Sequence, residues 1–107
     1  MDNNSAALNA LLNKIPRRFS IENIAGINQI LNDYENVLIG IEAINPYYEK
    51  GIPGYFEEME AIRSAVKKSG ENKNTKKVKD QLFDAASGEL KDTMQSVIDF
   101  YSNGEKA

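Results

Sequence analysis

The sequence contains no cysteine, no histidine and no tryptophan. Because cysteine is absent, the chain forms no disulfide and offers no thiolate as a nucleophile or metal ligand. Because histidine is absent, it lacks the usual general base near neutral pH and the commonest metal ligand. Tryptophan, a frequent anchor of protein interfaces, is also missing. These absences predict a protein that is not an enzyme and that needs no cofactor.

Long hydrophobic runs are missing as well. No segment approaches the ~20 consecutive apolar residues that span a bilayer. Residues 1–5 place no basic stretch ahead of an apolar run, as a secretion signal would. Hydrophobic residues make up 41% and charged residues 27% of the 107 residues, which is ordinary for a soluble domain. We expect residues 1–107 to form a single domain without a membrane span, located in the cytoplasm.

The clearest pattern is a stripe of apolar residues between Ser20 and Pro46. Its members recur every three or four positions, as one face of a helix requires, and not every second position as in a strand. Ser20 is a suitable N-cap, and Pro46 is expected to end the helix. The stripe consists of Ile24, Ile27, Leu31, Tyr34, Leu38 and Ile41. The sequence therefore predicts one long helix that buries this face against other helices.

Three further segments have helical periodicity. We expect helices over about 5–14, 53–68 and 75–102. The first two have an apolar stripe on one face, and the last carries apolar residues on more than one face. Residues 45–54 contain two prolines and two glycines and are expected to form the main corner of the chain. The whole pattern predicts an all-α protein with the architecture of a small antiparallel four-helix bundle, and an extended helical hairpin is the alternative.

Glycines and polar segments mark other special points in the chain. Gly26 and Gly40 lie inside the long helix, where each costs about 1 kcal/mol relative to alanine. We therefore expect another helix to approach closely at these two positions. Residues 69–75 are predicted to form a flexible basic loop, and residues 103–107 a frayed tail.

Positive charge gathers in one segment of this acidic chain. Residues 67–79 hold six lysines and one glutamate, although the whole chain has a net charge of −3. Such a cluster can contact an acidic protein or phosphate groups. The segment has neither arginine nor an aromatic residue, so nucleic acid is disfavoured as a partner. The candidate contact residues are Lys67, Lys68, Lys73, Lys76, Lys77 and Lys79.

Four aromatic residues cluster around the expected corner. Tyrosines on a turn stiffened by proline and glycine offer a large contact area at low entropic cost. The same rings could instead cover the open end of the bundle. The candidate partner-binding residues are Tyr47, Tyr48, Tyr55 and Phe56.

The C-terminal segment Tyr101-Ser-Asn-Gly-Glu105 matches a Tyr-x-x-x-Asp/Glu motif. In this motif and in its length, the chain resembles the small helical-hairpin substrates of type VII secretion. That resemblance implies a secreted helical hairpin. The chain departs from the family pattern because the Trp-x-Gly turn between the two helices is missing, and residues 46–54 occupy its place.

We therefore expect a non-catalytic module that binds another protein, such as an adaptor, a chaperone-like cofactor or an inhibitor among bacterial or phage accessory proteins. It would dock through a helix face and the aromatic corner. Two alternatives stay open. One is a self-associating helical-hairpin subunit, a homodimer or a type VII-like secreted protein, that pairs through the Ile24–Ile41 seam. The other is a weak nucleic-acid binder that uses the lysine-rich loop.

Overall fold

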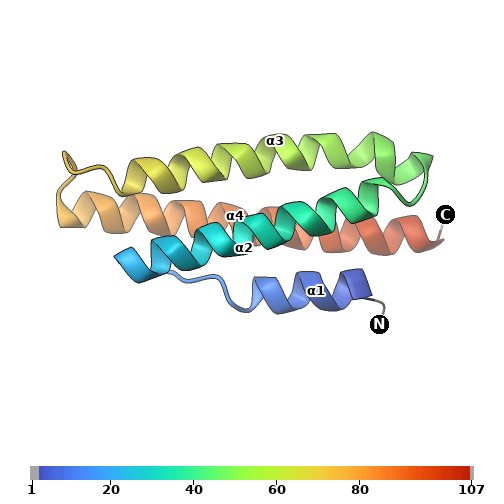
Figure 1. The fold of residues 1–107 in the computed structure, drawn as a ribbon, viewed down its shortest axis with the longest axis horizontal. Helices are drawn as coiled ribbons and strands as arrows, with labels where there is room; N and C mark the ends of the chain where they lie inside the picture. The colour runs from blue at the N-terminus through green and yellow to red at the C-terminus, as the bar shows by residue number, and fades with distance from the viewer. Residues whose placement is uncertain (1–2, 107) are drawn as a thin grey trace.

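A computed structural model describes residues 3–106, and almost all of them are helical. The helices are α1 (Asn3–Leu12), α2 (Ile21–Glu42), α3 (Pro46–Ser69) and α4 (Lys76–Lys106). Successive helices run in opposite directions along an elongated body of 48 × 23 × 17 Å (Figure 1). Both α2 and α4 pack against α3 on one side and against the short α1 on the other. The predicted antiparallel four-helix bundle is confirmed, and the alternative of an extended hairpin is wrong.

One face of each helix forms the interior. Leu31 and Leu38 of the predicted α2 stripe have no exposed surface, so this seam forms part of the core of the chain. From the other helices, the core takes Leu8, Leu11, Ile52, Met59, Ile62, Val66, Phe83, Leu90, Met94 and Val97. Within residues 3–106, no helix has the unbroken apolar length that crossing a membrane requires.

The predicted corner at residues 45–54 is wrong, because α3 already begins at Pro46. The Asn45 side chain accepts a hydrogen bond from the Tyr48 amide at 3.0 Å, and Pro46 suits the first helical turn because its φ is fixed and no amide is needed there. Pro53 lies inside the helix and removes one backbone hydrogen bond to Glu49. Both residues are exposed, so water can satisfy the free carbonyl, while burial of Ile52 holds the turn against the core.

The last helix is longer than predicted. It runs without interruption to Lys106, whereas residues 103–107 were expected to fray; Ala107 lies outside the described residues. The buried Tyr101 secures this last part of α4 to the start of α3. At the other end, residues 70–75 join α3 to α4, and Thr75 Oγ1 accepts a hydrogen bond from the Val78 amide at 3.2 Å.

The close approaches of helices occur at different glycines from those predicted. A Cβ built on Gly26 or Gly40 would meet no atom within 4 Å, so neither position requires glycine for packing. By contrast, a Cβ on Gly51 would overlap the Phe100 ring, and a Cβ on Gly104 would overlap the ring of Tyr48. These two glycines let α3 and α4 pack tightly at the end of the bundle where both chain termini lie (Figure 1).

Candidate functional site

Three of the four predicted aromatic anchors gather around Phe100 of α4. The ring of Tyr47 stacks on Phe100 with centroids 5.1 Å apart, and those of Tyr48 and Tyr55 lie 5.6 and 5.8 Å from it. Phe56 makes none of these ring contacts and is partly buried against the core. The aromatic rings therefore lie on a helix and cover one end of the bundle, in place of the exposed corner loop that the sequence predicted.

Burial leaves few of these rings open to a partner. Tyr48 is 2% exposed, and its hydroxyl donates a hydrogen bond to the main-chain carbonyl of Tyr101 at 2.8 Å. Tyr55 is half-buried, and its hydroxyl lies 3.0 Å from that of Ser96. Tyr47 is 45% exposed and is the ring of this group that offers the most surface. The sequence did not point to Phe100, which lies 45 to 53 residues away from these tyrosines along the chain.

A groove follows the outer junction of α3 and α4 beside this cluster. It consists of two neighbouring hollows of about 360 and 370 Å³ that share the lining residues Glu58 and Ser96. The first is lined by Glu58, Ala61, Ile62, Glu89, Asp92, Thr93 and Ser96, and the second by Gly51, Gly54, Tyr55, Glu58, Ser96 and Phe100. The first hollow is lined mainly by apolar surface, and glycine and alanine keep both hollows open.

The electrostatics of the α3/α4 groove are one-sided. Its lining includes the carboxylates of Glu58, Glu89 and Asp92 and no basic side chain. Thr93, nearly buried between the helices, donates a hydrogen bond to Glu58 Oε2 at 2.6 Å and so fixes that carboxylate across the groove. Sequence reasoning missed this site because Glu58 is 31 residues from Glu89, and only the pairing of α3 with α4 brings them together.

A buried tyrosine lies beneath this hydrogen bond. Tyr34 of α2 has no exposed surface, and its hydroxyl forms no hydrogen bond of standard geometry among residues 3–106, although the Thr93 hydroxyl lies near it. Burial raises the pKa of Tyr34 well above its ordinary value; the Thr93 hydroxyl opposes this shift, and the charge of Glu58 adds to it. The hydrogen bond from Thr93 thus holds the exposed carboxylate of Glu58 above this apolar core.

The acidic side chains of the groove do not form a metal site. Within residues 3–106, no three acidic side chains converge in the way that a metal ion requires. All three carboxylates instead line the first hollow, from both α3 and α4, where they can pair with several cationic groups of one ligand.

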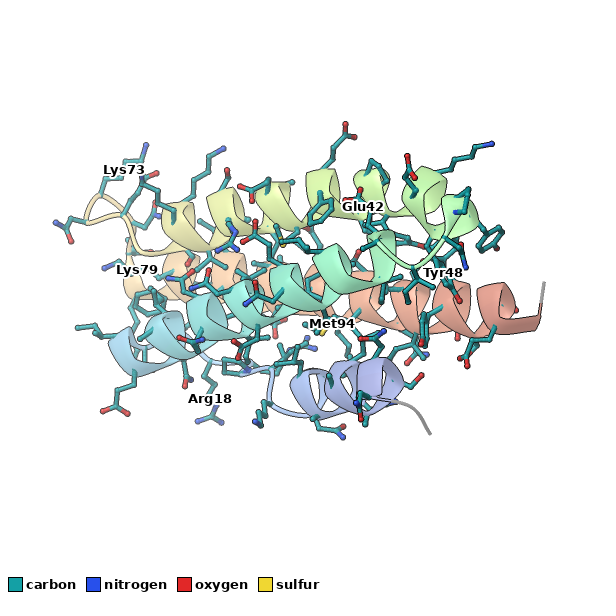
Figure 2. The ribbon with its side chains drawn as sticks, turned by 45° about the vertical axis from the view of Figure 1, so that its right-hand side comes forward. Arg18, Glu42, Tyr48, Lys73, Lys79 and Met94 are labelled. Carbon is teal, nitrogen blue, oxygen red and sulfur yellow. The ribbon has the colours of Figure 1, made fainter. Side chains whose placement is uncertain are left out.

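The predicted lysine cluster lies at the opposite end of the bundle from Tyr48. Lys73 and Lys79 mark this end in Figure 2, and Arg18 extends from the same half of the molecule. Arg17 pairs with Asp84 of α4 at 2.9 Å, which fixes the α1–α2 connector against the start of α4. The fold thus adds two arginines to the cluster, which the sequence gave no reason to group with lysines some 50 residues away.

Compared with known proteins, this chain matches no family model, no curated protein and no solved structure.

Proposed function

We propose that the protein is a non-catalytic binding module whose α3/α4 groove receives a basic, amphipathic segment of another protein. The observation that carries the proposal is the lining of the groove, which combines apolar surface with three carboxylates and no basic side chain. A ligand that fits must therefore offer apolar groups on one side and cations beside them. An amphipathic helix rich in lysine or arginine has this pattern.

The dimensions of the groove support a short helical segment. Its lining extends from Gly51 to Ile62 on α3, which corresponds to ~17 Å of helix at ~1.5 Å per residue. This length matches about three turns of a bound helix. Gly54 and Ala61 would let its backbone approach closely, and the rings of Tyr55 and Phe100 would contact its apolar side chains.

Tyr47 extends this surface toward the end of the bundle. It is half-exposed and stacks on Phe100, which lines the groove, so a partner bound in the groove would meet a ring that is already held in place. A preorganised aromatic residue loses little entropy on binding and is a typical interface anchor. Of the four aromatic anchors predicted from the sequence, Tyr47 and Tyr55 keep this role in the proposal.

Two labelled peptides test the proposal directly. One is an amphipathic 14-residue peptide of lysine and leucine, and the other replaces every lysine with glutamate. We expect fluorescence anisotropy to show binding of the lysine peptide and none of the glutamate peptide. The double variant Glu89→Lys/Asp92→Lys should weaken binding about tenfold, which corresponds to ~1.4 kcal/mol. Binding of both peptides alike would contradict the proposal.

Matched controls separate the groove from general charge effects. Glu22→Lys/Glu57→Lys changes the net charge by the same amount at exposed positions that do not line the groove, and it should preserve binding. Gly54→Trp should fill the second hollow without a change in charge and weaken binding, whereas Gly26→Trp on α2 should not. An equal effect of the two double variants would show that the groove is not the binding site.

A further inference from the structure

The end of the bundle opposite Tyr48 collects positive charge from three separate parts of the chain. Arg17 and Arg18 come from the α1–α2 connector, Lys67 and Lys68 from the end of α3, and the other lysines from the loop and the start of α4. This basic end consists of Arg17, Arg18, Lys67, Lys68, Lys73, Lys76, Lys77 and Lys79.

Most of these cations form no ion pair with the described residues. Arg17 pairs with Asp84 at 2.9 Å, Lys73 pairs with Glu71 at 3.3 Å, and Lys79 covers the ring of Phe19 at 5.4 Å. The remaining five are exposed and form no ion pair with any residue between 3 and 106; they are Arg18, Lys67, Lys68, Lys76 and Lys77. These five charges are free to bind an external anion.

Charge is strongly separated along the molecule. The basic end has eight basic side chains and the four acidic neighbours Glu22, Glu71, Asp80 and Asp84, whereas the rest of the sequence has five basic and twelve acidic residues. Both α2 and α4 begin at this end and α3 ends there (Figure 1), so two positive helix-dipole ends outnumber one negative end. A polyanion would therefore be attracted to this end and repelled by the remainder of the body.

We propose that the basic end binds the phosphate backbone of duplex nucleic acid, with the long axis of the protein pointing away from the duplex. Phosphate contacts need exposed cations and no particular base. The five unpaired cations provide them, and Arg18 adds the planar, bidentate donor that the lysine segment alone lacks. The proposal is independent of the α3/α4 groove, because the two surfaces share no residue.

Duplex is favoured over single strands because no ring at this end is free to stack on a base. Phe19 packs edge-to-face on Phe83 with centroids 6.2 Å apart, and Lys79 covers it. A bilayer is disfavoured because residues 70–77, which form the tip, include no apolar side chain that could enter the acyl region. Ile21 is 86% exposed, but it begins α2 behind this tip (Figure 1).

The test is fluorescence anisotropy with a 20-base-pair duplex of arbitrary sequence, measured as a function of salt. Each phosphate contact contributes about 0.9 to the slope of log affinity against log salt concentration. Lys68→Ala/Lys77→Ala should therefore lower that slope by about 2 and weaken binding about tenfold or more at moderate salt. The matched control Lys50→Ala/Lys91→Ala removes two exposed lysines outside the basic end and should change neither quantity.

Three results would overturn the proposal. The first is an absence of duplex binding by the wild-type protein at low salt. The second is an equal loss of affinity in the two double variants, which would indicate a general charge effect. The third is tighter binding to phosphatidylserine vesicles, or to a polyglutamate chain, than to the duplex, which would assign the basic end to a membrane or to an acidic protein. Circular dichroism of each variant checks that the exposed substitutions leave the helices intact.

Discussion

The hydroxyl of Tyr48, in the first turn of α3, donates a hydrogen bond to the main-chain carbonyl of Tyr101, near the end of α4, at 2.8 Å. The two rings also stack, with centroids 5.4 Å apart. Tyr48 is 2% exposed and Tyr101 6% exposed, so the pair is part of the core. This contact sets the register of α3 against α4 at the end of the bundle farthest from the loop that connects the two helices.

Removal of the Tyr48 hydroxyl should destabilise the bundle. We expect Tyr48→Phe to lower the free energy of unfolding by about 1 kcal/mol, because a buried hydrogen bond is lost while the ring and its packing stay. Tyr47→Phe is the control. Because the Tyr47 ring is 45% exposed, this substitution should change the free energy of unfolding by less than about 0.5 kcal/mol. Urea denaturation followed by circular dichroism measures both, and equal values would mean that the hydrogen bond is not stabilising.

Substitution of alanine for glycine should raise the stability of the protein at two positions and lower it at two others. Gly26→Ala and Gly40→Ala should each stabilise the protein by about 0.5–1 kcal/mol, because both sites are helical, exposed and free of neighbours. Gly51→Ala and Gly104→Ala should destabilise it, because the new methyl group would overlap the ring of Phe100 or Tyr48. Thermal unfolding midpoints give the sign of each change. Stabilisation at all four positions would contradict the packing described for the aromatic cluster.

The glycines show which part of the fold the sequence could predict. Apolar periodicity is a local signal, and it correctly predicted four antiparallel helices and the buried stripe of α2. Whether a glycine faces another helix depends on which face of its own helix is buried. It also depends on which side chains the neighbouring helix places against that face. Gly26 and Gly40 lie on the exposed face of α2. Gly51, by contrast, faces the ring of Phe100, which is 49 residues later in the sequence. No local pattern contains that information.

The start of α3 shows that local sequence also does not fully determine secondary structure. Proline and glycine at residues 46–54 favour a turn when only neighbours are considered. Burial of Tyr48 and Ile52 against the core, together with the Asn45 cap, instead makes this segment helical. The candidate sites depend even more on long-range pairing, because Glu58 meets Thr93 and Arg17 meets Asp84 only after the bundle has formed.

The unpaired hydroxyl groups of the core should cost stability. Tyr34 and Ser87 are fully buried, and neither hydroxyl forms a hydrogen bond of standard geometry among the residues that the structure describes. Tyr34→Phe and Ser87→Ala should therefore each raise the free energy of unfolding, by about 1 kcal/mol, because the desolvation penalty of a polar group disappears and the packing changes little. Urea denaturation at neutral pH measures the effect. A loss of stability in Tyr34→Phe would show that its hydroxyl is bonded in solution, for example to the Thr93 hydroxyl, which already opposes the rise in its pKa.

The same tyrosine predicts how stability depends on alkaline pH. Because burial raises the pKa of Tyr34, the folded protein keeps the phenol proton at a pH where the unfolded chain releases it near its ordinary pKa of 10.0. The unfolded state then binds fewer protons than the folded state, so the contribution of this group is fully present below pH 10 and falls as the pH rises above it. For one proton, the free energy of unfolding falls by at most ~1.4 kcal/mol for each unit of rising pH.

Comparison with Tyr34→Phe isolates this contribution, since lysines and the other tyrosines titrate in both proteins. We expect the stability advantage of Tyr34→Phe over the wild type to be constant between pH 7 and 9 and to grow from pH 10 upward, with urea unfolding at pH 7, 9, 10 and 11 as the measurement. Parallel stability curves for the wild type and Tyr34→Phe would show that the buried hydroxyl ionises as readily in the folded bundle as in the unfolded chain.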